Sequence, residues 1–245
     1  MDEGAFDACA ASVRRADPDR YFSALFAPAE RRPFLFALYA FNHELARIGE
    51  RAREPMMGAV RLEWWRETID GARAGAARPH DVARAMAAVL AAAPLPQDMI
   101  EAMIEARRGD LDPEPFAGAV ARAAYLDATS GNLMRLAARL LGAGGSLDEL
   151  AREAGLAYGL AGLLRNDASG RVGKRLIPAP DVASVAREAR EHFGRARKLF
   201  PSSRGACAAV LPAALAPLYL RNPATDIPIW RRQIALLRAA LRGRL

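Results

Sequence analysis

The chain has 245 residues, a composition rich in Ala, Leu and Arg, and a formal net charge of +7. A chain of this length buries roughly 70–75% of the surface that its unfolded form exposes, which is enough for one domain with one core. Alternating apolar runs bounded by turn residues are absent, which excludes a sheet and predicts an all-α fold. The sequence also has no zinc finger, aromatic-interleaved basic strand or helix-turn-helix, so nucleic acid is not an expected partner.

The amino-terminal residues Met1 to Gly4 are acidic and no apolar region follows them, so no secretory signal is expected. No apolar run approaches the roughly 20 residues of a membrane span. Cys9 and Cys207 are isolated in sequence, which indicates buried, inert thiols in a reducing compartment rather than a zinc or redox site. We therefore expect a cytoplasmic protein, soluble or peripheral at a membrane.

Proline positions, capping residues and apolar spacing predict helices along the whole chain. The first runs from Asp2 to Ala16 and ends before Pro18, because a residue that precedes proline avoids the α region. Short helices follow between Asp19 and Phe26. The other predicted helices, which bring the array to about ten, span residues 34–53, 55–74, 79–93, 96–109, 113–141, 147–165, 181–200, 204–219 and 227–241.

The predicted helix over residues 34–53 carries an apolar stripe with the spacing of a core-facing helix. Its members are Phe34, Leu38, Phe41, Leu45 and Ile48. On the next helix, Glu63 and Glu67 are carboxylates four positions apart and are the only candidates for a metal pair there. A solvated face near Arg66 and Arg73 is the favoured interpretation of that pair.

Three glycines lie inside the predicted helix over residues 147–165, although each costs about 1 kcal/mol relative to alanine. Gly155, Gly159 and Gly162 are spaced so that one side of the helix is free of side chains. We expect them to permit the close approach of another helix. A cavity for an apolar ligand is the alternative.

Dispersed motifs resemble those of the squalene/phytoene synthase family, which are head-to-head prenyl transferases. The matching segments are Tyr21-Phe22, Arg31-Arg32, Ala37 to Phe41, Trp64 to Arg66, Asp110-Leu111, Tyr125 with Gly131, and Leu163 to Arg165 leading to Pro178. The resemblance implies a single isoprenoid-synthase-type helical bundle over residues 1–245. In the family, two facing helices each carry Asp-x-x-x-Asp and hold the Mg²⁺ ions that neutralise the departing diphosphate.

The chain departs from the family at those metal ligands. The first motif falls on Ala46 and Glu50, with Arg47 in place of a further acidic residue, and the second falls on Asn166 and Gly170. A charge pair at ~4 Å contributes on the order of 4 kcal/mol at an effective dielectric constant near 20. Loss of three carboxylates should therefore remove most Mg²⁺ affinity, which predicts a pseudoenzyme with no catalytic residue and no cofactor.

Other positions correspond to the family's substrate tunnel or to the place of its diphosphate. The tunnel positions are Tyr39, Phe41, Tyr125, Gly131, Gly159 and Gly162, and Met134 replaces a glycine and should narrow the tunnel. Five cations are candidates for binding an anion or an acidic partner, namely Arg47, Arg165, Arg171, Lys174 and Arg175. For the last three, a solvated basic loop is the slightly favoured interpretation, and binding of a lipid headgroup, a diphosphate or an acidic partner surface is the functional one.

A narrower set of motifs resembles a non-catalytic branch of the same superfamily, whose mitochondrial member is an assembly factor for respiratory complex I. These motifs are Ala40 to Asn42, Glu44 to Ala46, Arg61-Leu62 with Trp65, Leu111-Asp112, and Leu164-Arg165 leading to Leu176 to Pro178. The resemblance implies an assembly factor in a bacterial cell. Its expected partners are complex I subunits or assembly intermediates, with an anionic surface of the inner membrane as a further candidate.

The sequence leaves two alternatives open. One is a prenyl transferase of the squalene/phytoene synthase type that binds Mg²⁺ through atypical ligands, with Glu50, Glu63 and Glu67 as candidates. The other is an isoprenoid-binding or lipid-binding protein that keeps the cavity without the chemistry.

The carboxy-terminal predicted helix is cationic and amphipathic. Trp230, Ile234, Leu237 and Leu241 share one face, and Arg231, Arg232, Arg238 and Arg242 flank it. Such a helix can close a bundle with its apolar face or lie on a membrane. We favour closure of the bundle, because one helix of this length binds membranes weakly without a second signal.

Overall fold

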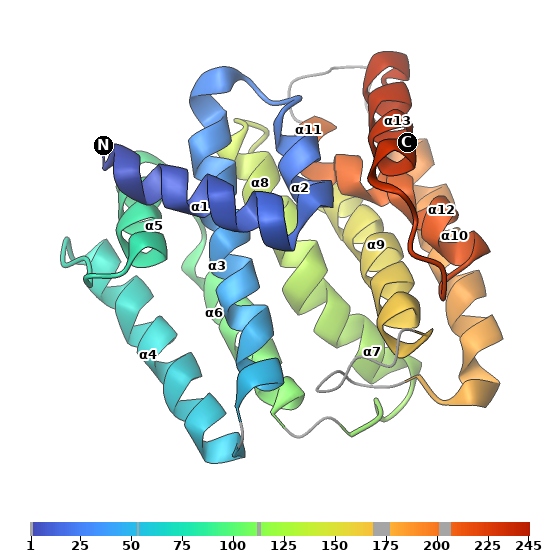
Figure 1. The fold of residues 1–245 in the computed structure, drawn as a ribbon, viewed down its shortest axis with the longest axis horizontal. Coiled ribbons are helices and arrows are strands. Elements are labelled where there is room, and N and C mark those ends of the chain that lie inside the picture. The colour runs from blue at the N-terminus through green and yellow to red at the C-terminus, as the bar shows by residue number, and fades with distance from the viewer. Residues whose placement is uncertain (1, 53, 112–113, 169–176, 201–206) are drawn as a thin grey trace.

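The computed structural model describes residues 2–52, 54–111, 114–168, 177–200 and 207–245, and this part of the chain contains helices and no strand. The all-α prediction is confirmed. The helices form one array, in which α4 and α5 lie at one side, α10, α12 and α13 at the other, and α3, α6, α8 and α9 between them (Figure 1). The α-helices are α1 (Glu3–Ala16), α2 (Pro18–Ala24), α3 (Arg32–Arg51), α4 (Pro55–Arg73), α5 (Asp81–Ala92), α6 (Gln97–Ala106), α7 (Ala119–Leu126), α8 (Asn132–Leu140), α9 (Asp148–Ala168), α10 (Val182–Leu199), α11 (Cys207–Val210), α12 (Ala216–Arg221) and α13 (Ile229–Arg242).

Two helices that the sequence predicts as continuous are interrupted. The helix predicted over 113–141 begins only at Ala119, because Gly118 has a φ of +112°, and a π-helical segment, Asp127–Gly131, separates α7 from α8. The helix predicted over 204–219 is divided into α11, a 3₁₀ segment and α12, because Pro212 and Pro217 provide no backbone N–H.

The start of α2 is fixed by a short capping sequence. The Asp17 side chain accepts a hydrogen bond of 3.1 Å from the backbone N–H of Arg20, and Pro18 occupies the first turn. This cap holds the acidic and basic side chains of residues 17–20 at one end of the bundle.

The core has a large cluster around α3 and a second cluster beneath α13. Leu35, Leu38 and Phe41 of α3 are completely buried, and α1, α4, α5 and α8 pack around this helix. Leu160 of α9 and Leu236 of α13 belong to the second cluster, with residues of α10 and α12. The predicted apolar stripe of α3 is therefore confirmed as a core face.

The two cysteines differ in exposure. Cys9 is completely buried, and burial raises the pKa of its thiol to about 12. It is an inert thiol, as expected from its isolation in sequence. Cys207 is only partly buried, so that part of the prediction is wrong for Cys207.

The predicted orientation of α13 is also wrong. The helix packs on the bundle through Leu236 and Ala239, which are 0% and 8% exposed, whereas the stripe that begins at Trp230 faces outward. No helix in the described residues is both long enough and apolar enough to cross a membrane.

The backbones of α9 and the π-helical segment lie in direct contact. A Cβ atom added at Gly155 would lie 2.7 Å from the Cα of Gly131 and 2.8 Å from the carbonyl carbon of Ser130. At Gly159 it would lie 2.8 Å from Cδ2 of Leu126. The predicted packing role is confirmed for these two glycines. Gly162 differs, because a Cβ there would meet nothing within 4 Å.

We predict that Gly155→Ala and Gly162→Ala change stability in opposite directions. The first forces a methyl group into fixed backbone and should lower the free energy of unfolding by roughly 1–3 kcal/mol. The second adds a helix-favouring residue in open space and should raise it by up to about 1 kcal/mol. Urea denaturation of the two variants measures both effects on one helix. Equal free energies of unfolding would contradict the contact described here.

Candidate functional site

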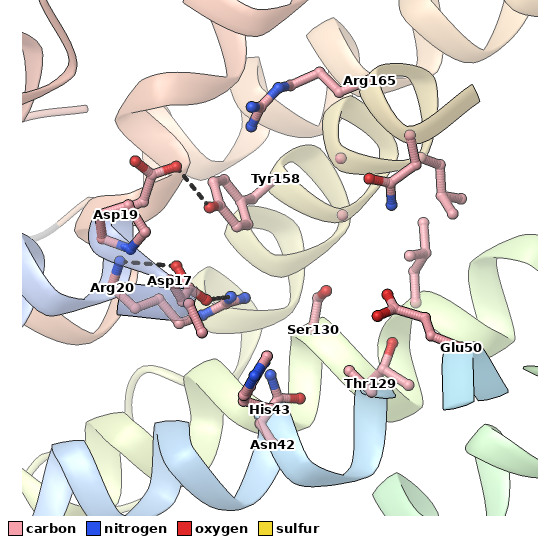
Figure 2. Close-up of a pocket in the computed structure, with 18 of the residues that line it drawn as sticks. Asp17, Asp19, Arg20, Asn42, His43, Glu50, Thr129, Ser130, Tyr158 and Arg165 are labelled. Atoms are coloured by element: carbon pink, nitrogen blue, oxygen red, sulfur yellow. Dashed lines mark hydrogen bonds and ion pairs between the residues drawn. The ribbon is translucent and has the colours of Figure 1, made fainter. Parts of the chain in front are cut away.

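A cleft with a volume of about 610 Å³ opens between α3 and α9. In Figure 2, α3 carries His43 and Glu50 on one wall, and α9 carries Tyr158 and Arg165 on the other. The start of α2, the π-helical segment, the 3₁₀ segment Arg107–Asp110, the end of α7, residues 223–226 and α13 also contribute to the lining. Most of the lining side chains are polar or charged, among them Asp17, Asp19, Arg20, Asn42, His43, Glu50, Arg107, Asp110, Tyr125, Thr129, Ser130, Tyr158, Arg165, Asn166, Asp226 and Arg232.

The structure brings three of the four predicted metal-ligand positions to this cleft. Ala46 and Glu50 line it from α3, and Asn166 lines it from α9. Gly170 lies outside the described residues. The cleft therefore stands where the family's two motifs would face each other, and Glu50 is the one carboxylate that the sequence has at these four positions.

The predicted tunnel residues divide into two groups. Tyr125, Gly159 and Gly162 line the cleft. Tyr39, Phe41 and Gly131 do not. They are buried behind it, Phe41 edge-on to Trp65 and Gly131 against α9.

Met134 and Tyr39 are both buried without lining the cleft. Met134 packs in a small apolar cluster with Leu150 and Val210. The hydroxyl of Tyr39 has no hydrogen-bond partner among the described residues, and its ring lies 6.0 Å from the guanidinium carbon of Arg20.

The predicted anion-binding cations are also separated. Arg165 lines the cleft, with its guanidinium carbon 3.9 Å from the centre of the Tyr219 ring. Arg47 points instead into a second pocket of about 280 Å³ between α3 and α4, where its Nη1 lies 2.9 Å from Glu44. Arg47 therefore does not line the cleft that holds the metal-ligand positions. Arg171, Lys174 and Arg175 are outside the described residues.

The cleft also contains a hydrogen-bonded cluster that the sequence did not reveal. It consists of Asp19, Tyr158, Tyr219 and Arg232, and we call it the Asp19 hub. Asp19 is 4% exposed and accepts hydrogen bonds from the Tyr158 hydroxyl at 3.0 Å, from the Tyr219 hydroxyl, and from Arg232 at 2.7 Å. Its partners lie at least 139 positions away in sequence, so no local pattern could have identified them.

Arg20 lies next to the Asp19 hub and is paired with its own capping residue. Its Nη1 is 2.5 Å from Asp17, and its guanidinium carbon is 5.0 Å from the centre of the Tyr158 ring. Burial by itself would lower the pKa of Arg20, but the charge of Asp17 and the neighbouring tyrosines more than offset this effect. The pKa is raised overall, so the guanidinium stays charged. Opposite, burial and the charge of Arg47 lower the pKa of His43, so that this imidazole favours the neutral form.

A second polar cluster also lines the cleft. Asp110, which is 3% exposed, accepts hydrogen bonds from Arg107 at 3.2 Å and from the Tyr125 hydroxyl at 3.0 Å. Arg107 also reaches Asn42 of α3 at 3.4 Å. A Cβ at Gly49 would lie 2.5 Å from the carbonyl oxygen of Asp110, so glycine is required for α3 to approach this cluster.

These contacts test whether the cleft suits a Mg²⁺–diphosphate centre. Mg²⁺ requires oxygen ligands, usually carboxylates, in near-octahedral geometry. The buried carboxylates of the cleft are already paired with arginines, Asp19 with Arg232 and Asp110 with Arg107. In the described residues no three His, Cys, Asp or Glu side chains are grouped to hold a metal ion. The residues present do not fit such a centre.

The candidate substitute pair lies elsewhere. Glu63 and Glu67 are absent from the cleft lining and pair with arginines of the surface, Glu63 with Arg66 at 2.9 Å and Glu67 with Arg78 at 2.6 Å. They form part of a solvated face of α4, as the favoured interpretation of the sequence expected.

Fold and cleft together define a helical protein of the isoprenoid-synthase type. Solved structures confirm the fold. A dehydrosqualene synthase in complex with ligand superposes with a TM-score of 0.79 at 16% identity, covering 98% of this chain and 96% of that one. A squalene synthase from Alicyclobacillus acidocaldarius superposes with a TM-score of 0.72 at 20% identity, covering 98% and 94%.

The sequence profile named Squalene/phytoene synthase matches residues 13–171, and the chain belongs to that family. Among curated proteins, it is 27% identical over 188 residues to NADH dehydrogenase (ubiquinone) complex I, assembly factor 6 of Bos taurus, covering 76% of this chain and 56% of that protein. It is 27% identical over 158 residues to the Homo sapiens protein of the same name, covering 64% and 47%. The chain thus spans about half the length of these relatives.

We predict that the Asp19 hub makes stability fall in alkaline solution. Burial, followed by the charge of Asp19, raises the pKa of Tyr158 and of Tyr219 in the folded protein. The unfolded tyrosines lose their protons near pH 10 while the folded ones keep them. The stability that the two tyrosines contribute is therefore fully present below pH 10. Above pH 10 the free energy of unfolding should decrease by about 1.4 kcal/mol per pH unit for each tyrosine.

Urea denaturation between about pH 9 and 12 tests this linkage. Tyr158→Phe and Tyr219→Phe should each reduce the slope of unfolding free energy against pH by about 1.4 kcal/mol per unit. At neutral pH each variant should lose about 1.5–3 kcal/mol, because the hydrogen bond that it removes is made to a carboxylate. A slope unchanged in both variants would show that neither hydroxyl is held protonated by the fold.

Proposed function

We propose that the protein is a non-catalytic member of the squalene/phytoene synthase family that acts in the assembly of respiratory complex I. The observation that carries the proposal is the state of the cleft. Ala46 and Asn166 stand at ligand positions, and the buried carboxylates Asp19 and Asp110 are bound to arginines of the chain itself. A cleft with these ligands is poorly suited to ionising an allylic diphosphate.

The relatives support the assembly role. The curated proteins that resemble this chain over most of its length are named as complex I assembly factors. The proposed partners are complex I subunits or assembly intermediates, met in the cytoplasm or at the inner membrane. The chain matches only about half of each relative, so the support for the assembly role comes from that matched part.

The cleft suits a protein partner in its chemistry. Arg165 and Asn166 of α9 line it together with Thr129 and Ser130, which supply donors and acceptors for a polar surface. Arg165, with Arg171, Lys174 and Arg175 of the following segment, is the proposed binding site for an acidic partner surface or another anion. Arginine is well suited to such contacts, because its fork binds carboxylates in two hydrogen bonds.

The volume of the cleft is consistent with one alternative function. A cleft of about 610 Å³ falls within the range of small-molecule sites, so an isoprenoid-binding or lipid-binding protein is the second candidate. A working prenyl transferase would require Mg²⁺ and ligands other than Glu63 and Glu67.

We predict that the purified protein, given Mg²⁺ and farnesyl or geranylgeranyl diphosphate, releases no diphosphate and makes no C30 or C40 product. The joint variant Ala46→Asp, Glu50→Asp, Asn166→Asp and Gly170→Asp should still show no substantial activity, because the arginine-paired carboxylates and the glycines of α9 remain. An authentic squalene synthase serves as the positive control. Metal-dependent product above a heat-killed control would establish the enzyme alternative.

We predict that deleting the gene lowers NADH:quinone oxidoreductase activity in membranes and leaves squalene, hopanoid and carotenoid levels unchanged. Complementation with Arg165→Glu should restore less activity than complementation with Arg190→Glu. The two changes reverse the same charge, one in the cleft and one on the exposed face of α10. Altered lipid profiles with normal complex I activity would reject the assembly role in favour of the enzyme or carrier.

A further inference from the structure

The outward face of α13 carries four large apolar side chains in one row. Trp230, Ile234, Leu237 and Leu241 are 53%, 38%, 45% and 68% exposed. Their spacing of four, three and four residues places them within a narrow stripe along the helix. We call these four residues the α13 stripe.

The α13 stripe is held in place by contacts on the opposite side of the helix. Leu236 and Ala239 are buried in the second core cluster, and Arg232 makes its ion pair with buried Asp19. The helix therefore does not need the stripe for docking. The fold presents the stripe on a fixed helix.

One edge of the stripe is lined by exposed arginines. Arg231, Arg238 and Arg242 follow one another at intervals of seven and four residues, so they lie along the same side of the helix. Arg231 lies 5.2 Å from the centre of the Trp230 ring. Among the described residues none of the three forms an ion pair, and the sequence of α13 contains no Asp or Glu.

We propose that α13 lies on an anionic membrane surface, with the α13 stripe in the interfacial region and Arg231, Arg238 and Arg242 on lipid phosphates. An amphipathic helix with a cationic edge binds lipid through its apolar area and through attraction to anionic headgroups. Tryptophan at the margin suits the boundary between acyl chains and headgroups. This surface is separate from the cleft and does not depend on the proposed assembly role.

The charges argue against a second copy of the chain as the occupant. Two α13 helices that met through their stripes would place two rows of arginines around one seam. Because α13 has no acidic residue, these charges would have no counter-charge on the partner helix. An anionic bilayer supplies that charge.

Sedimentation with lipid vesicles tests the proposal on the full chain. The wild type should bind phosphatidylglycerol-containing vesicles, bind phosphatidylcholine vesicles much less, and bind less as salt is raised. Arg238→Glu with Arg242→Glu, and separately Leu237→Ser with Leu241→Ser, should reduce partitioning roughly tenfold or more. Thermal unfolding should be nearly unchanged, because all four side chains are exposed.

Two matched variants on other helices serve as controls. Arg190→Glu with Arg197→Glu makes the same charge change on the exposed face of α10, and Met56→Ser with Met57→Ser removes exposed apolar side chains from α4. Both should keep wild-type partitioning. If the α10 and α13 charge variants lost vesicle binding equally, the net charge of the protein would explain the binding, and the proposal would be wrong.

Fluorescence quenching by brominated phosphatidylglycerol places the helix at the bilayer. The fluorescence of the wild type should be quenched. Trp230→Phe should lose the part of the quenching that comes from Trp230, because the two other tryptophans lie on α4 and not on the proposed membrane-binding helix. Quenching that is the same in Trp230→Phe would contradict the proposal. So would α13 variants that bind vesicles normally but lose self-association or co-purifying protein, which would assign the stripe to a second copy or to a protein partner.

Discussion

The contact between α9 and the π-helical segment determines the geometry of the cleft. At Gly155 no side chain separates α9 from the backbone of Gly131 and Ser130, so the two elements lie as close as two backbones can. One turn later, Gly159 packs on Leu126 and Ser130 and also lines the cleft. Thr129 and Ser130 thus come to line the cleft beside α9, and Gly162, with nothing near it, leaves the space open.

The cleft built on this contact neutralises its own charge. Asp17, Asp19 and Asp110 each lie within ion-pair distance of an arginine, namely Arg20, Arg232 and Arg107. Buried ion pairs add little net stability, but breaking one leaves an uncompensated charge and costs several kcal/mol. The pairs therefore fix which helices meet at the cleft more than they increase the stability of the fold. In an enzyme of this family, bound metal ions would contribute positive charge at the same place.

The sequence correctly predicted those parts of the cleft that depend only on the periodicity of a helix. Ala46 and Glu50 share a face because they are four residues apart on α3, and Asn166 comes from the facing helix, so their meeting could be anticipated. Arg47 is one residue further around the helix than Ala46, and its pairing with Glu44 turns it into another pocket. The Asp19 hub, in contrast, depends on the path of the whole chain. The stripe of α13 was recognised in the sequence, but its favoured inward orientation was wrong for the same reason, because the distant contact between Arg232 and Asp19 helps to set the rotation of the helix.

The Asp19 hub also constrains the order in which the chain can fold. Asp19 lies in the second helix, whereas Tyr158, Tyr219 and Arg232 follow it by 139, 200 and 213 positions. Contacts of such long sequence separation form slowly, and the last of them cannot form until Arg232 has left the ribosome. Until then the carboxylate of Asp19 lacks the ion pair with Arg232 that compensates its burial in the folded protein. Docking of α13 is therefore the step that completes the amino-terminal half of the protein as well as the carboxy-terminal half.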